Sequence, residues 1–222
     1  PAGVSDATGA VGVAVAIDSQ VTWRNVTVDV GNIKALAYDD RTAYAAGFAY
    51  SNSYTSPTST TEGDFVNCTI TADSLQAISN RGTSVSSGFM YTQRCSMTGC
   101  EVNIGRISSE GNTAVSSGFA TFFSVNENNT LYTLNGCTVK SGEIVSHCNS
   151  EQQTGSSESS VAGLVYDVYS SNGVSGSGTQ ILNCAVEIGN ELNNTGNAYK
   201  SKSLLVTYNE NGSTIKDNTV TL

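Results

Sequence analysis

A short strand-and-turn unit recurs along almost the whole chain, and this repeat constrains the fold more than any other feature of the sequence. Its copies lie at 23–28, 65–70, 97–102, 134–139, 181–186 and 215–220. The fourth residue of the unit, taken as the reference position, lies 42, 32, 37, 47 and 34 residues from its equivalent in the next copy. A constant unit with connections of variable length is typical of a solenoid, in which each repeat packs only against its neighbours.

The residue types within the unit predict a strand that follows a tight turn. In most copies apolar residues stand three positions before the reference, at the reference and two positions after it, and the last two alternate with polar residues as in a half-buried strand. The residue just before the reference is Asn25, Asn67, Gly99, Gly136, Asn183 or Asp217. Since these residue types best tolerate the left-handed backbone conformation, we expect a positive φ angle there.

A second turn and a second strand are predicted further along each repeat. The fifth residue after the reference is Gly31, Asp73, Gly105, Gly142 or Gly189. Two residues beyond it stand Ile33, Leu75, Ile107 and Ile144, and in the fifth copy Leu192 comes one residue late. A turn residue followed by an apolar residue predicts a corner and then a second strand that faces the core.

A third strand is predicted around a Gly-aromatic pair at 46–50, 87–91 and 117–121, with Gly-Leu at 162–166 and no Gly at 203–207. Side chains two residues apart share one face of a strand, and equivalent side chains one coil away stack at about 4.8 Å. We therefore expect an internal stack, rather than an exposed sugar-binding strip, from six aromatic residues: Phe48, Phe89, Phe119, Tyr50, Tyr91 and Tyr166.

These strands together predict an all-β fold, a single-stranded parallel β-helix of about six coils with three strands per coil that close a triangular tube. Parallel crossovers are right-handed in about 98% of cases, so we expect a right-handed helix. The 222 residues include 22 Gly and only 2 Pro, and they suffice for one domain, 1–222, with a continuous core. Because the first residue is Pro1, we expect a segment of a larger secreted protein.

The strand Gly, Phe or Leu, any residue, Tyr, together with the strand Asn, Cys, Thr, Val or Ile, resembles the GLUG-type repeats of bacterial surface proteins. Those proteins resemble the pectin-lyase-like β-helices. The resemblance covers roughly 12–222, although this chain usually has one Gly rather than two before the aromatic residue. It implies an adhesin of the cell surface, and the pectin-lyase-like helices imply, as the alternative, an enzyme that acts on polysaccharides.

Charge and hydropathy exclude two classes of partner. The chain has 19 acidic and 10 basic residues, a net charge of −9, and no cluster of Lys and Arg that could follow a phosphate backbone. The longest apolar candidate, 11–17, is the length of a strand and well short of the roughly 18–20 residues of a transmembrane helix. We therefore expect no nucleic acid partner and no membrane insertion of this segment.

Four of the six cysteines occupy the reference position: Cys68, Cys100, Cys137 and Cys184. The first copy has Val26 there, which favours small buried hydrophobes and hence a ladder of free thiols. Disulfides between neighbouring copies stay an alternative, because Cα atoms about 4.8 Å apart lie within disulfide range. Cys95 and Cys148 lie outside the ladder, and a bridge between them is a further alternative.

The sequence predicts no catalytic, cofactor-binding or metal-ligating residue and no cofactor. Its only histidine, His147, stands beside Cys148, without the cluster of Cys and His residues that zinc requires. The closest acidic pair, Asp39 and Asp40, is expected in a solvated turn. On the outward face of the repeat Lys140 and Glu187 share one offset, which predicts a cross-strand ion pair.

Function is therefore expected in the irregular connections. Three of them, 51–64, 149–160 and 170–179, are rich in Ser, Thr, Gly or Asn. We expect a non-catalytic, adhesin-like or stalk segment of a bacterial secreted or cell-surface protein, which binds a glycan or a host surface protein through its loops. Tyr54, Tyr132, Tyr169 and Tyr199 are expected in such loops. A carbohydrate-active enzyme, lyase-like or glycoside hydrolase-like, and a phage tail fibre segment are the alternatives.

Overall fold

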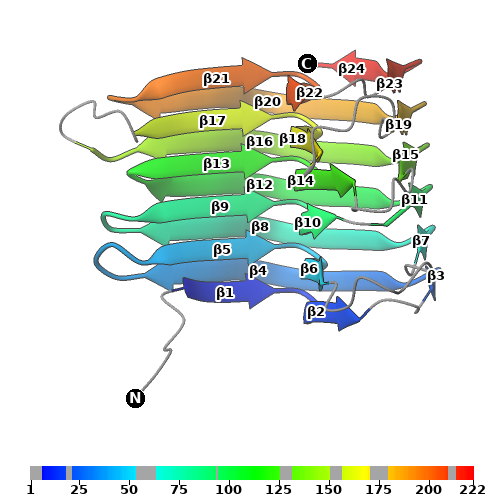
Figure 1. Cartoon of the computed structure of the whole chain (residues 1–222), viewed down its shortest axis with the longest axis horizontal. Helices are drawn as coiled ribbons and strands as arrows, with labels where there is room; N and C mark the ends of the chain where they lie inside the picture. The colour runs from blue at the N-terminus through cyan, green and yellow to red at the C-terminus, as the bar shows by residue number, and fades with distance from the viewer. Residues whose placement is uncertain are drawn as a thin grey trace.

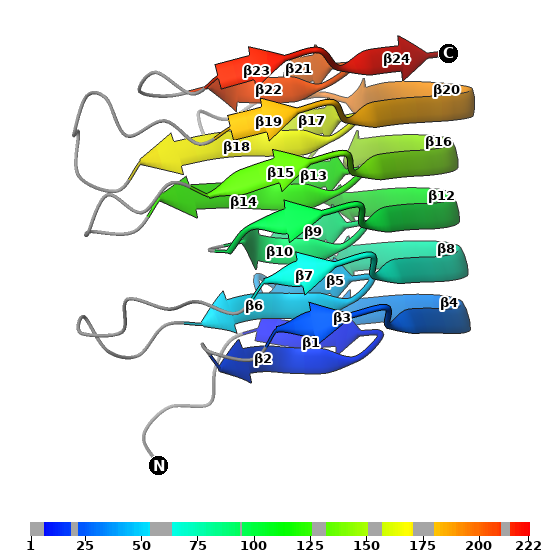
Figure 2. The same cartoon turned by 90° about the vertical axis from the view of Figure 1, so that its right-hand side faces the viewer.

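The computed structural model describes residues 7–18, 22–53, 64–93, 95–125, 132–150, 157–170, 180–209 and 214–222. Within these ranges 24 strands form four six-stranded parallel sheets, named A to D here (Figures 1 and 2). In Figure 1 sheet A runs from left to right at the front and sheet D from right to left behind it, while the chain rises from its N-terminus to its C-terminus. The chain is therefore a right-handed parallel β-helix, as the sequence predicted.

One coil passes through sheets A, B, C and D in that order, so β1 to β4 form the first coil and β21 to β24 the sixth. Sheet A contains β1 (Ala7–Val11), β5 (Thr42–Ala46), β9 (Thr83–Ser87), β13 (Thr113–Ser117), β17 (Glu158–Ala162) and β21 (Tyr199–Ser203). Sheet B contains β2 (Ala14–Asp18), β6 (Ala49–Ser53), β10 (Met90–Gln93), β14 (Ala120–Val125), β18 (Val165–Ser170) and β22 (Val206–Asn209). Sheet C contains the short strands β3 (Trp23–Arg24), β7 (Phe65–Val66), β11 (Met97–Thr98), β15 (Thr133–Asn135), β19 (Gln180–Leu182) and β23 (Thr214–Lys216). Sheet D contains β4 (Thr27–Ala37), β8 (Thr69–Ser79), β12 (Glu101–Gly111), β16 (Thr138–Cys148), β20 (Ala185–Gly196) and β24 (Thr219–Thr221).

Each coil has four strands where the sequence predicted three. The two strands predicted on either side of Gly31 are one strand, β4, whose alternation changes phase there: Val28 and Val30 pack against the core before Gly31, and Ile33 after it. A local irregularity of this kind re-aims the side chains without ending the strand. The late Leu192 lies in register with Ile144, after a shift in the pairing of β16 with β20.

The strand of sheet A is one of two that the sequence did not predict, the other being the two- or three-residue strand of sheet C that precedes the predicted turn. The inward residues of sheet A are small and almost fully buried, among them Ala43, Ala45, Ser84, Ser86, Ala114 and Ser116. The hydroxyls reach backbone acceptors: Ser86 donates to the carbonyl oxygen of Ser108 at 2.6 Å, and Ser116 to that of Val145 at 2.7 Å. Buried hydroxyls paired in this way cost little, and their small volume lets sheet A pack closely on sheet D.

Two of the four corners contain two residues in every coil. At the C-to-D corner the residue before the reference position has the predicted positive φ, with values of 54°, 53°, 62°, 61°, 53° and 56° at Asn25, Asn67, Gly99, Gly136, Asn183 and Asp217. At the A-to-B corner the pair is a glycine and its successor in five coils, and Leu204 with Leu205 in the last. Constant corners keep the equivalent strands in register.

The other two corners vary in length. At the B-to-C corner the connections are 19–22, 54–64, 94–96, 126–132, 171–179 and 210–213. At the D-to-A corner they are 38–41, 80–82, 112, 149–157 and 197–198. The unequal spacing of the repeat therefore arises at two edges of the solenoid.

The core holds a stack of aromatic rings next to the A-to-B corner. Phe48 lies on Phe89 with ring centroids 4.9 Å apart, and Phe89 lies on Phe119 at 5.0 Å with nearly parallel planes. All three rings are fully buried, and Leu164 continues the column. The predicted internal stack is confirmed for the phenylalanines.

The cysteines at the reference position form a column of buried free thiols. Each thiol donates to the carbonyl oxygen two residues before it, with Sγ–O distances of 3.6 Å at Cys68, 3.7 Å at Cys100, 3.6 Å at Cys137 and 3.3 Å at Cys184. The predicted burial is confirmed, and burial raises the pKa of the Cys137 thiol well above its usual value.

The alternative bridge between Cys95 and Cys148 does not form. Both cysteines are buried, and neither is part of a disulfide. Cys95 lies at the B-to-C corner just before β11, whereas Cys148 ends β16 at the D-to-A corner and donates to the carbonyl oxygen of Asn112 at 3.1 Å. Different corners of the coil hold the two residues.

Candidate functional site

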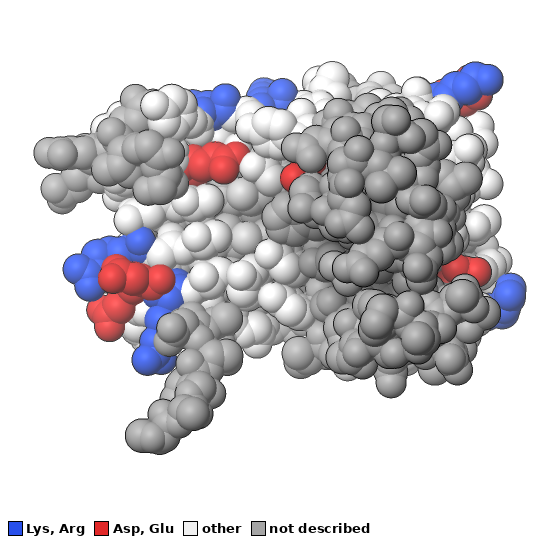
Figure 3. Space-filling view, viewed as in Figure 1, with Lys and Arg blue, Asp and Glu red and all other residues white. Residues whose placement is uncertain are grey.

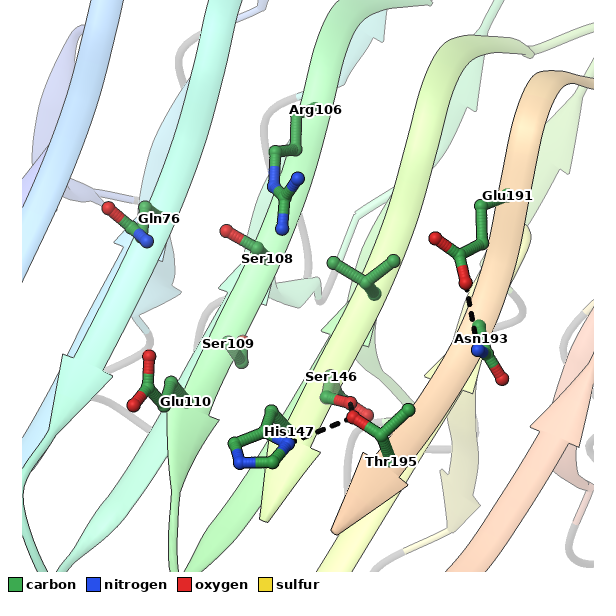
Figure 4. Close-up of a pocket in the computed structure, with 11 residues that line it drawn as sticks. Gln76, Arg106, Ser108, Ser109, Glu110, Ser146, His147, Glu191, Asn193 and Thr195 are labelled. Atoms are coloured by element: carbon green, nitrogen blue, oxygen red, sulfur yellow. Dashed lines mark hydrogen bonds between the residues drawn. The ribbon is translucent and has the colours of Figure 1, made fainter. Parts of the chain in front are cut away.

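Charged and polar side chains gather on the outer face of sheet D, where β12, β16 and β20 run side by side (Figure 4). In-register pairing places Arg106, Glu143 and Glu191 in one row across the three strands. The Arg106 guanidinium lies 2.7 Å from the Glu143 carboxylate, and Glu191 accepts a hydrogen bond of 2.8 Å from Asn193. This row is a network of paired polar groups.

A second row lies four residues further along the same strands and contains the only histidine of the chain. Glu110, His147 and Thr195 occupy equivalent positions on the same three strands. His147 Nδ1 lies 2.9 Å from Thr195 Oγ1, and Glu110 stands on the other side of the imidazole (Figure 4). The two rows border a shallow depression of about 200 Å³. A carboxylate and an imidazole side by side can accept and donate protons.

The ion pair predicted for Lys140 has a different partner. Lys140 Nζ lies 3.0 Å from Glu101 Oε1, on the strand of the preceding coil. This hydrogen bond is the main cause that raises the pKa of Lys140, and Glu187 in the following coil adds a smaller effect through its charge. Lys140 and Glu187 do lie opposite each other on β16 and β20. The ion pair is instead diagonal, to Glu101, which lies opposite Thr138. Register alone therefore did not decide the pairing.

The tyrosines predicted to stack inside lie outside the main core, where sheets A and B meet. Tyr50 and Tyr91 are only partly buried, whereas Tyr166 is buried as predicted, but in a second, smaller hydrophobic cluster. Phe48 occupies the A-to-B corner and strand β6 begins at Ala49, so the alternation restarts and Tyr50 points away from the core. Tyr50 and Tyr91 are half-buried and stack on each other with centroids 4.9 Å apart. Tyr44 of β5 closes this group at 4.7 Å from Tyr91. We call Tyr44, Tyr50, Tyr91 and Tyr166 the tyrosine row.

The pKa values of three phenols in this row, Tyr50, Tyr91 and Tyr166, are raised above the ordinary value. Burial, and then the neighbouring Tyr44, raise the pKa of Tyr50 to about 12. Burial raises the pKa of Tyr91 further, and burial together with the Glu158 carboxylate raises that of Tyr166. At neutral pH these three phenols are therefore uncharged, and that of Tyr166 donates a hydrogen bond to Glu158.

A pocket of about 240 Å³ lies at the C-terminal end of the row, between β17 and β21. Its hydroxyls form a chain that converges on Glu158: Tyr166 and Ser160 both donate to Glu158 Oε1 at 2.5 Å. Because the one hydroxyl proton of Ser160 goes to Glu158, the hydroxyl of Ser201, 2.5 Å away, must donate to Ser160. Tyr199 borders the pocket. Carboxylate, hydroxyls and aromatic rings thus meet in one place.

Most of 51–64 and of 170–179, and half of 149–160, lies outside the described residues. Of 51–64 the structure describes Ser51–Ser53 as the end of β6 and Asp64; of 149–160 it describes 149–150 and 157–160; of 170–179 only Ser170. Tyr54 lies outside the described residues. Tyr169 lies within β18, and Tyr199 is 60% exposed but begins β21, so neither is in a loop. The prediction for Tyr132 is wrong, because this ring is 2% exposed and packs in the core.

The described acidic residues of the predicted turn behave as expected. Asp39 and Asp40 are exposed, and Arg81 lies 3.5 Å and 3.4 Å from them. Within the described ranges, no group of three or more His, Cys, Asp and Glu side chains could hold a metal ion. The same residues contain no helix long and apolar enough to span a membrane.

The fold defines this chain as a parallel β-helix repeat protein. No protein-family profile matches the chain, and neither a curated protein nor a solved structure matches it. The resemblance to GLUG-type repeats therefore rests on the repeat motifs alone.

Neither the tyrosine row nor the sheet D rows were predicted as sites. Tyr44, Glu158 and Tyr166 come from strands whose order in space depends on the unpredicted sheet A. One signal was present: Glu110 and His147 stand at equal distances from their reference cysteines, and this offset predicts adjacency once the coil is known.

Proposed function

We propose that this chain is a non-catalytic, adhesin-like or stalk segment of a bacterial secreted or cell-surface protein, which binds a glycan or a host surface protein. The observation that carries the proposal is the arrangement of the variable corners. The D-to-A connections precede sheet A and the B-to-C connections follow sheet B, so connections of unequal length flank the outer face that carries the tyrosine row. Variable connections on a constant scaffold are the usual place for binding residues.

The chemistry of this face favours a glycan with few charges. The partly buried Tyr50 and the exposed Tyr199 offer aromatic surface for the apolar faces of sugar rings, and the pocket offers Glu158 and the serine hydroxyls for sugar hydroxyls. Figure 3 shows that charged side chains on the described surface over sheet A lie towards its edges. The resemblance to GLUG-type surface proteins supports the same class of partner.

Glycan and host-protein arrays test this proposal. We expect binding to a glycan that falls at least tenfold in Tyr199→Ala and Glu158→Gln, and on shortening the connection 149–157. Glu187→Gln on sheet D, an equal change of charge on another face, serves as the control and should bind as the parent does. Binding that survives all three changes, or no binding on either array, would contradict the proposal.

A carbohydrate-active enzyme is the second candidate, and the row of Glu110, His147 and Thr195 is the observation that favours it. A carboxylate next to an imidazole could serve as acid and base on a polysaccharide. A panel of polysaccharides, assayed with and without calcium, decides between the two functions. Turnover that disappears in Glu110→Gln and His147→Asn would establish the enzyme and refute the non-catalytic proposal.

A further inference from the structure

The A-to-B corner imposes a strict condition on every coil that carries another coil on its C-terminal side. A Cβ atom at the glycine of this corner would lie 1.9–2.0 Å from the carbonyl oxygen of the equivalent residue in the next coil. Five coils meet the condition, with Gly12, Gly47, Gly88, Gly118 and Gly163. The sixth coil has Leu204 at this position, 39% exposed. A further coil stacked in the same register would place a carbonyl oxygen on the Cβ atom of Leu204.

Sheet A of the sixth coil carries a second obstacle. Lys200 and Lys202 of β21 lie in register with Ser159 and Val161, which are fully buried inward residues of β17. Both lysines are exposed at the open end of the solenoid, and Figure 3 shows basic side chains along this upper edge. Lys202 borders an open depression there together with Leu222. A further coil would bury two ammonium groups, while the one carboxylate of the sheet A strands, Glu158, occupies an outward position. Inward charges on an edge strand discourage pairing.

The reference column also ends differently. Asn218 replaces the cysteine of the earlier coils, and both ends of its amide turn back to the fifth coil. Its Nδ2 donates to the carbonyl oxygen of Ile181 at 3.1 Å, and its Oδ1 accepts from the backbone N–H of Cys184 at 2.7 Å. The fifth coil therefore provides hydrogen-bond partners for both ends of the Asn218 amide.

From these three independent features we infer that the sixth coil is a cap, which prevents a second copy of this chain from stacking on the C-terminal end of the solenoid. A head-to-tail contact would lay β1 of one copy on β21 of the other. It would set Gly12 against Leu204, and the inward residues Thr8 and Ala10 against the two lysines. Solenoids need terminal repeats that stop such growth.

The cap can be removed with the residues that the fifth coil itself uses at the same positions. The variant carries Lys200→Ser, Lys202→Val, Leu204→Gly and Asn218→Cys. Sedimentation velocity should show the parent chain at one mass from 1 to roughly 200 μM, a range that covers weak association. The variant should grow into rods whose mass rises with concentration.

Two controls distinguish a specific end-to-end contact from non-specific association. Adding Ala10→Lys to the variant should abolish the rods, because it places a charge on the inward face of β1. Lys34→Ser with Lys140→Val removes two outward lysines and should leave the parent mass unchanged. Rods formed by the parent chain, or a folded variant that keeps the parent mass, would overturn the inference.

The milder pair Lys202→Val and Leu204→Gly covers the case in which the fourfold variant does not fold. Its β-sheet content is checked by circular dichroism. We expect its average mass to rise at the highest concentrations, and a constant mass in this folded protein would also overturn the inference.

Discussion

Gly88 and Gly118 pack backbone against backbone, with the site of a Gly88 Cβ atom only 1.9 Å from the carbonyl oxygen of Gly118. We predict that Gly88→Ala destabilises the protein by about 3 kcal/mol, because the two coils would have to separate locally. Urea unfolding followed by circular dichroism measures the loss. Gly189→Ala is the matched control: its Cβ would come no closer than 3.9 Å to a heavy atom, so it should cost less than about 1 kcal/mol. Equal losses would contradict the steric explanation.

Asn67 holds a positive φ of 53° at the C-to-D corner. Asn67→Ala should lower the free energy of unfolding by about 1 kcal/mol, because the left-handed conformation is unfavourable for alanine. Asn67→Gly should stay within a few tenths of a kcal/mol of the parent, because glycine adopts this conformation freely. Thermal unfolding of the three proteins checks the order. A glycine variant as unstable as the alanine variant would show that the Asn side chain matters more than the backbone angle.

The thiol column should be unreactive in the folded protein. At pH 8 iodoacetamide should leave Cys68, Cys100, Cys137 and Cys184 unmodified, because the side chains are buried and the thiolate is the reactive form. In denaturant without reductant the same four thiols should all be alkylated, as intact-mass analysis will show. Two mass-verified disulfides within the column would refute the free-thiol structure.

Tyrosine ionisation should lower stability at high pH. The pKa of Tyr50 is about 12 in the folded protein and about 10 in an unfolded chain, so the folded state holds this proton more tightly. The contribution is therefore complete below pH 10 and is lost as the pH rises through 12. Absorbance at 295 nm should show a late fraction of tyrosinate that shrinks in Tyr50→Phe. Ionisation of all tyrosines in one step near pH 10 would contradict the burial of the row.

The turns and the inward residues of the long strand were predictable because the residue types repeat at fixed offsets. Asn25 and Gly99 predict the positive φ, and Ile33 and Ile107 predict the second inward segment. The phase change at Gly31 was interpreted as a corner. Two consecutive outward residues, Gly31 and Asn32, produce the same sequence pattern in a turn and in a bent strand.

Sheet A and the tyrosine row could not be predicted in the same way. Strand β9 reads Thr-Ser-Val-Ser-Ser, and its burial comes from the serine hydroxyls that pair with sheet D rather than from apolar periodicity. Tyr50 was assigned to the face of Phe48 because the two-residue corner between β5 and β6 cannot be seen in the spacing. The glycine that occupies this corner in five coils was placed inside the third strand, because it has no positive φ that would identify a turn.

The corners of variable length separate two dimensions of the molecule. A coil with 32 residues between reference positions and one with 47 climb by the same strand spacing, about 4.8 Å, because the strands, not the connections, set the rise. Residues added at the variable corners therefore do not lengthen the solenoid, and only an additional coil does. The length of such a protein along its axis is thus set by its number of coils and not by its number of residues.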